Sequence, residues 1–199
     1  MKHRLTLSRD PKFAPILTSV KPYRPQKQRD IYFRLMRAIS GQQLSVKAAS
    51  TIWERFLTLF PDKYPHPTLV IALEPERMRQ AGLSYQKASY LKAIAEFALR
   101  NDITYETISK LDDEEIIEYL TQIKGVGRWT VEMILMFALG RKDVFPADDL
   151  GIINAMKKLY NLRVTGRALR QRCIRISQKW KPYRSYACFY LWPYKDSVR

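Results

Sequence analysis

The sequence feature that most restricts the fold is a very short connection between two helical patterns, in the stretch 111–139. Apolar residues recur at helical spacing on both sides of Ile123-Lys-Gly-Val-Gly. Gly125 and Gly127 can adopt positive φ, and they leave no side chain between the turn and an approaching partner. We therefore predict two helices, over 111–122 and 128–139, joined by a tight hairpin.

The second helix of this pair would present its first backbone N–H groups beside the hairpin. These donors, the positive end of the helix and the side chains of Lys124 and Arg128 could hold a backbone phosphate without reading base sequence. The alternative is an ordinary connection between two helices with a glycine C-cap, and the glycines alone favour neither interpretation.

Helical spacing also dominates the rest of the chain, where strand signals are scarce. We expect a helix over 10–20 that Asp10 caps, a helix that follows the aspartates at 148 and 149, and helices over 30–40, 44–60, 84–100, 166–179 and 182–192. Two short turns fill 68–81, and three prolines between 60 and 67 exclude a helix there. Because no internal repeat or long linker divides the chain, we predict one all-α domain over 1–199.

The charge balance favours a polyanionic partner. The 35 Lys and Arg residues against 19 Asp and Glu leave a formal net charge of +16 and a pI of about 9.9. Nucleic acid is the first expectation. An anionic membrane surface is the weaker alternative, since the basic residues are spread over several helices and not gathered on one amphipathic segment.

Several other classes of protein are excluded by what the chain lacks. The apolar run from Met133 to Leu139 is too short to span a bilayer, and the polar N-terminus has no signal-peptide core, so we expect an intracellular protein. Only Cys173 and Cys188 are present, too few cysteines for a disulfide framework, a structural zinc site or a four-cysteine cluster. Neither His3 nor His66 lies in a catalytic motif. We therefore expect no cofactor and no catalytic metal.

A pair of aspartates follows the apolar helix of the hairpin. Val144-Phe-Pro-Ala leads to Asp148 and Asp149 and then to a helix. Capping of that helix explains one aspartate, which would leave Asp149 to point into a cleft. There it could stabilise positive charge on a substrate, such as a sugar becoming an oxocarbenium ion, or orient a water molecule. On residue types alone, a plain acid at the helix start is an equal alternative for Asp149.

Taken together, the motifs resemble those of the helix–hairpin–helix DNA glycosylases, in particular the alkylation-repair branch of DNA-3-methyladenine glycosylase II type. The resemblance is carried by KGVGRWT at 124–130, VFPADD at 144–149, AISGQQLSVKAA at 38–49, AGLSYQKASYLKAIA at 81–95 and KWKPYRSYACFYLW at 179–192. It covers the chain from about Asp10 to Trp192. It implies a two-lobed all-α fold with the active-site cleft between the lobes and a hairpin motif at about 111–139. We expect no separate N-terminal β domain of the kind that some members of this family carry, because only about ten residues precede the first predicted helix.

The resemblance also implies roles for single residues. Asp149 falls on the catalytic position and Asp148 on one that supports the helix start. Lyase-type relatives carry a Schiff-base lysine where this sequence has Trp129, so a monofunctional enzyme is implied. Trp129, Tyr183 and Met133 would line the base pocket. The implied DNA contacts, with the wedge that fills the gap left by a flipped nucleotide at 42–44, are Gln42, Gln43, Leu44, Lys124, Gly125, Val126, Gly127, Arg128 and Thr130.

The implied function is base excision repair. The enzyme would flip alkylated purines, 3-methyladenine first and 7-methylguanine and related lesions next, out of duplex DNA and hydrolyse the N-glycosidic bond to leave an abasic site. Damaged double-stranded DNA would be its partner, in the cytoplasm and nucleoid or in a nucleus, and we expect a monomer. A monovalent or divalent ion at the hairpin carbonyls of Ile123 and Val126 is compatible with the resemblance when DNA is bound.

Two alternatives remain open at this point. A non-catalytic DNA-binding protein would use the hairpin for architecture alone, with Asp149 as a dispensable cap. A bifunctional glycosylase/lyase of the same fold would need an amine nucleophile, which Trp129 does not supply.

Overall fold

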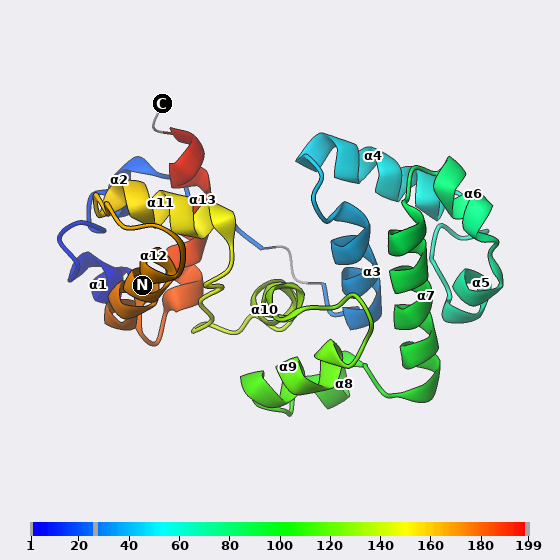
Figure 1. Cartoon of the computed structure of the whole chain (residues 1–199). Helices are drawn as coiled ribbons and strands as arrows, with labels where there is room; N and C mark the ends of the chain where they lie inside the picture. Colours follow the sequence, from blue (N-terminus) through cyan, green and yellow to red (C-terminus); the bar gives the residue numbers. More distant parts are fainter. Residues whose placement is uncertain (1, 26–27, 198–199) are drawn as a thin grey trace. The chain divides into compact units, whose positions relative to one another are not determined.

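The computed structural model describes residues 2–25 and 28–197, the last two of these by backbone only, and every element assigned within them is a helix (Figure 1). The predicted all-α class is confirmed. The chain divides into two compact units, which we call the terminal unit (Met1–Lys27 and Leu135–Arg199) and the internal unit (Gln28–Ile134). Within the described residues, no helix is long and apolar enough to cross a membrane.

The internal unit is organised around its longest helix. It contains α3 (Ile31–Gly41), α4 (Val46–Leu57), α5 (Pro67–Ala72), α6 (Pro75–Gln80), α7 (Tyr85–Arg100), α8 (Tyr105–Ile108), α9 (Asp113–Thr121) and the beginning of α10 (Arg128–Phe137). Figure 1 shows α7 between α3 and α5, and it packs on both. Leu91 and Ile94 of α7 are completely buried, so the apolar face that the sequence pattern predicts forms the core of this unit.

Side-chain caps fix the starts of these helices. Asp30 accepts a hydrogen bond from the Phe33 backbone N–H, and Ser84 accepts one from Lys87 N–H. Asp112 and Glu115 form a reciprocal capping box at the start of α9. The helices predicted over 30–40, 84–100 and 111–122 are therefore confirmed, with boundaries that shift by one or two residues.

The terminal unit combines both ends of the chain. It contains α1 (Lys2–Ser8), α2 (Ile16–Ser19), α11 (Leu150–Leu159), α12 (Gly166–Ser177), a 3-10 helix (Gln178–Trp180) and α13 (Arg184–Ser197). In Figure 1 the blue N-terminal segments lie beside the yellow-to-red C-terminal helices. Trp180 is completely buried at the centre, with the rings of Phe13, Phe145 and Tyr160 around it.

The N-terminal segment differs from the sequence prediction. The predicted helix over 10–20 is reduced to α2 at 16–19, and an unpredicted helix, α1, precedes it. Asp10 does not cap the predicted helix: its Oδ1 accepts from Lys12 N–H, and its Oδ2 accepts from the Tyr160 hydroxyl at 2.6 Å. Tyr160, which lies 150 residues away in the sequence, binds this segment through Asp10. Local sequence patterns cannot predict such a distant hydrogen bond.

Candidate active site

Asp149 lies at the start of α11 and is held there by two donors. Its Oδ1 accepts a hydrogen bond from the Ile152 backbone N–H at 2.8 Å, which makes Asp149 the N-cap of the helix. The indole N–H of Trp192, on α13, donates to the same oxygen at 3.1 Å. The residue is only 8% exposed. The orientation of this carboxylate is therefore set by one backbone donor and one rigid side chain.

The structure corrects the prediction of which aspartate caps α11. Asp149 is the cap, because it is the residue directly before Leu150, and its side chain reaches the third N–H of the helix. Asp148 turns away to α12, where its two oxygens accept from Arg170 at 2.5 and 3.2 Å. The expectation that Asp149 is free of capping was wrong. The roles of cap and candidate catalytic residue fall on one side chain.

A glycine makes the contact between Asp149 and Trp192 possible. A Cβ placed on Gly151 would lie 3.0 Å from Asp149 Oδ1 and 3.3 Å from Trp192 Cδ1. Any side chain there would displace one of the two groups. Sequence reasoning missed Gly151 and Trp192. Trp192 closes the last motif that carries the resemblance, but nothing in that motif indicates its contact with Asp149.

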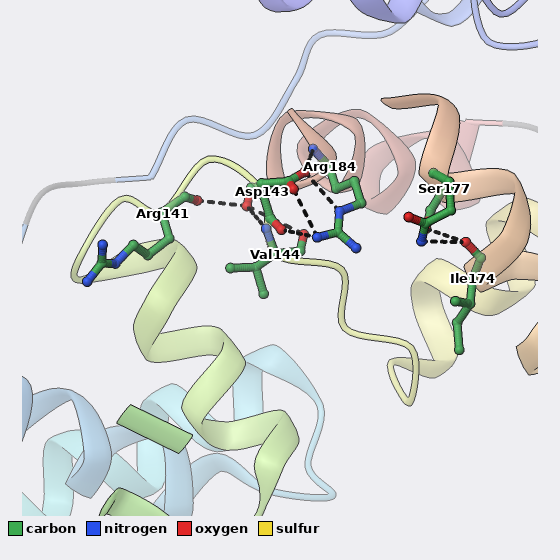
Figure 2. A network of polar contacts seen from close by, with 8 residues as sticks. Arg141, Asp143, Val144, Ile174, Ser177 and Arg184 are labelled. Atoms are coloured by element: carbon green, nitrogen blue, oxygen red, sulfur yellow. Dashed lines mark hydrogen bonds and ion pairs between the residues drawn. The ribbon is translucent and has the colours of Figure 1, made fainter. Parts of the chain in front are cut away.

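The loop that carries the aspartates is fixed to the start of α13, as Figure 2 shows. Arg184 donates from Nε to Asp143 Oδ1 at 2.8 Å and from Nη2 to the Asp143 carbonyl at 2.7 Å. Ser185 Oγ donates to the Arg141 carbonyl at 2.7 Å and accepts from the Val144 N–H at 2.9 Å. The loop and the indole that holds Asp149 are thus attached to the same helix.

Tyr183, a predicted pocket residue, belongs to an aromatic cluster of the terminal unit. Its ring meets Tyr186 edge-on at a centroid distance of 5.9 Å, and His3 stacks in parallel on Tyr186 at 4.3 Å. Burial lowers the pKa of His3 below its usual value. No sequence pattern indicates a role for His3, because only the folding of α1 brings it to these rings.

The hairpin belongs to the internal unit and depends on one glycine. Gly125 has a φ of +91°, and a Cβ on it would collide with the ring of Tyr90 on α7. This residue therefore provides the positive φ that the sequence indicated, and it also permits close packing on α7, which the sequence did not indicate. Gly127 is not among the glycines with positive φ, and a Cβ on it would meet no atom within 4 Å. The space beside Gly127 is therefore open.

The two hairpin cations differ in their surroundings. Arg128 donates to both oxygens of Glu114, one of them at 2.9 Å, and its Nε lies 3.4 Å from Glu132 Oε1. Two carboxylates therefore partly neutralise the positive charge of Arg128. Lys124 is exposed. Arg128 is exposed as well, so the two predicted phosphate contacts differ in their recorded carboxylate partners and not in their exposure.

The other predicted residues of α10 vary in exposure. Trp129 is 36% exposed, Met133 is half-buried, and Thr130 is buried. The Thr130 hydroxyl accepts from Gln42 Nε2 at 3.4 Å, which connects the predicted wedge segment to the first turn of α10.

The wedge segment is anchored at its base and exposed at its tip. Lys87, on α7, donates from Nζ to the Ser40 carbonyl at 2.9 Å and to the Gln42 carbonyl at 2.8 Å. Burial lowers the pKa of Lys87. Gln43 has a φ of +58°, and Leu44 is 38% exposed. Sequence reasoning did not identify Lys87, whose partners lie more than forty residues away along the chain.

The helical hairpin, the all-α fold and the helix-capping aspartate define a protein of the helix–hairpin–helix DNA glycosylase class. The chain belongs to the HhH-GPD superfamily of base excision DNA repair proteins, whose family model matches residues 36–181. It is an enzyme of the DNA-3-methyladenine glycosylase type.

Individual relatives support this assignment. The chain is 40% identical over 179 residues to DNA-3-methyladenine glycosylase 1 of Schizosaccharomyces pombe, an alignment that covers 89% of this chain and 78% of that protein. The structure of S. pombe 3-methyladenine DNA glycosylase (Mag1) in complex with abasic DNA superposes with a TM-score of 0.88 at 38% identity, over 96% of this chain and 95% of that one. A DNA-3-methyladenine glycosidase from Bacillus halodurans gives a TM-score of 0.82 at 30% identity, with 96% and 88% covered.

The first prediction concerns the hydrogen bond from the Trp192 indole to Asp149. Trp192→Phe keeps most of the ring volume but removes the N–H donor to Oδ1. We expect the single-turnover rate of base release to fall about tenfold, as a loss of about 1.4 kcal/mol would give. Trp53→Phe, which alters a buried tryptophan of the internal unit, is the control. Equal rates for the two variants would contradict a positioning role for Trp192.

The second prediction concerns the wedge segment. Lys87→Met retains the methylene chain but leaves two carbonyls without their ammonium donor, so the free energy of unfolding should drop by about 1–3 kcal/mol. Binding to a duplex with an abasic site should weaken about tenfold. Lys92→Met, on the same helix, is the matched control, because Lys92 donates only to the Ile71 carbonyl among its recorded contacts. Identical dissociation constants for the two variants would show that Lys87 supports the fold alone.

Proposed function

We propose that this protein excises alkylated purines, 3-methyladenine first, from double-stranded DNA and leaves an abasic site. The observation that best supports this proposal is the buried Asp149 carboxylate, which two N–H donors hold at the start of α11. The curated relatives support the choice of lesion through their names. We further propose that the enzyme acts as a monomer in the compartment that contains DNA, which is the nucleoid of a bacterium or the nucleus of a eukaryote.

The first step of the proposed mechanism is binding of the duplex. Backbone N–H groups at the start of α10 and the exposed Lys124 bind a backbone phosphate without reading sequence. Gln43 or Leu44 enters the stack as the damaged nucleotide leaves it. Flipping costs a few kcal/mol, and less for a lesion that pairs poorly. Selection against normal bases thus begins before the chemical step.

The second step is recognition of the extruded base. A purine methylated at N3 or N7 carries a positive charge, so aromatic faces attract it by a cation–π interaction of roughly 0.5–2 kcal/mol. We propose that Trp129 of the internal unit and Tyr183 of the terminal unit each offer such an aromatic face, and that Met133, one turn further along α10, adds an apolar side chain. A neutral purine gains no cation–π attraction, so recognition discriminates by charge.

The third step is cleavage of the bond between the sugar C1′ and the base nitrogen. The bonding electron pair leaves with the base, which becomes neutral, and positive charge develops on the sugar. The Asp149 carboxylate stabilises that charge and orients a water molecule, whose oxygen bonds to C1′ while its proton passes to the carboxylate or to solvent. Because a cationic base departs as a neutral molecule, the reaction requires no strong general acid.

The absence of an amine at position 129 determines the product. Trp129 cannot form a Schiff base, so water completes the reaction and the DNA backbone is left intact. We propose that no cofactor takes part in the chemistry. An ion held by the carbonyls of Ile123 and Val126 would act on phosphate binding alone.

The third prediction tests this function by its products. The wild-type protein, incubated with methylated duplex DNA, should release 3-methyladenine and should yield strand breaks only after alkali treatment. Borohydride should trap no covalent protein–DNA adduct. An undamaged duplex of the same sequence is the control and should release no base.

Two results would overturn the proposal in different ways. Duplex binding without any base release would favour the architectural DNA-binding alternative. Strand breaks before alkali, together with a borohydride-trapped adduct, would identify a bifunctional glycosylase/lyase.

A further inference from the structure

The net positive charge of this protein comes from one of its two units. The terminal unit carries 21 Lys and Arg residues against 5 Asp and Glu, whereas the internal unit carries 14 of each kind. The whole surplus of +16 therefore belongs to the terminal unit. The hairpin lies in the internal unit, which has no net charge, so the predicted phosphate contact there does not account for the basic character of the chain.

The carboxylates of the terminal unit are already engaged. Asp10 binds the Tyr160 hydroxyl, Asp143 binds Arg184, Asp148 binds Arg170, and Asp149 caps α11. These four are the acidic side chains that the structure describes in this unit. Of the basic residues that follow α11, these bonds reach Arg170 and Arg184, and they do not reach Arg163, Arg172 or Arg175.

Three of those basic residues surround one surface hollow of about 540 Å³. Arg163 comes from the loop after α11, and Arg172 and Arg175 come from one face of α12. All three side chains are exposed, and the hollow between them is completed by Asn161, Val164 and Gln171 among others. We call this surface the arginine hollow. Three guanidinium groups around one hollow repel one another unless an anion lies among them.

We propose that the arginine hollow binds the phosphate backbone of DNA at a second place, apart from the hairpin. The inference rests on the proposed function, in that DNA is the polyanion on which the enzyme acts. Guanidinium groups bind phosphate oxygens through paired hydrogen bonds, and they do so without reading bases. Such a contact supplies affinity for any duplex and so serves the search for lesions.

Long DNA fits this surface better than a small anion does. A charge surplus of +16 spread over one unit exceeds what a single phosphate could neutralise, whereas a duplex presents a phosphate every few ångströms along its length. The hollow offers no exposed aromatic face for stacking: its one ring, Tyr160, is buried and its hydroxyl is bound to Asp10. Duplex backbone is therefore preferred over unstacked single strands.

The fourth prediction concerns the salt dependence of binding. In the variant Arg163→Gln/Arg172→Gln/Arg175→Gln, the slope of log K against log salt for an undamaged duplex should become shallower by about 2 to 3, one for each lost phosphate contact. The dissociation constant at moderate salt should rise at least about tenfold. The single-turnover rate of base release at saturating enzyme should stay unchanged, because none of the three residues takes part in the chemistry.

The control removes the same number of charges from the internal unit: Arg55→Gln/Lys63→Gln/Lys110→Gln, all at exposed positions. An equal change of slope in both variants would reduce the effect to overall charge and overturn the proposal, as would an unchanged slope in the first variant. Should the triple variant fold poorly, the three single variants replace it, each with an expected slope change of about one. The binding assay needs no excision, so a wild type that releases no base would defeat the proposed function while leaving this test intact.

Discussion

The site depends on the two hydrogen bonds that Asp149 Oδ1 accepts, from the Ile152 N–H and from the Trp192 indole. Burying a carboxylate is costly unless donors replace the water that it loses. The start of α11 supplies one donor together with the positive end of the helix, and α13 supplies the other. Several contacts of the terminal unit serve this requirement. Gly151 leaves space for the indole beside Asp149, and Arg184 and Ser185 bind the preceding loop to the helix that carries Trp192.

Sequence reasoning succeeded where structure is local. The apolar spacing and the capping residues Asp30 and Ser84 predicted the long helices of the internal unit, and the glycine turn predicted the hairpin with its positive φ at Gly125. The resemblance to known glycosylases, and not any spacing rule, identified Asp149 as the candidate catalytic residue. Its capping bond is local as well, but two adjacent aspartates left open which of them forms it.

The failures share one cause, which is dependence on distant contacts. Asp10 was predicted to cap a helix over 10–20, but the Tyr160 hydroxyl donates to its side chain and the predicted helix does not begin there. The polar segment of α1 gave no helical signal, yet Leu7 is completely buried in the folded unit. Trp192, Lys87 and His3 join partners that lie far away along the chain. A sequence pattern indicates which face of a helix is buried, but not which side chain of another element meets it.

We propose that the Asp149 side chain both caps α11 and performs the chemistry, and the pair Asp149→Asn and Asp149→Ala separates these roles. Asparagine caps a helix about as well as aspartate, and its amide oxygen can accept from Ile152 and Trp192, whereas alanine accepts from neither. The measurement is thermal stability together with the single-turnover rate of base release from methylated duplex DNA. The account predicts that Asp149→Asn keeps the wild-type stability to within about 0.5 kcal/mol while base release falls by about a thousandfold, and that Asp149→Ala loses both. Base release at the wild-type rate by a stable Asp149→Asn protein would show that Asp149 is a cap and nothing more.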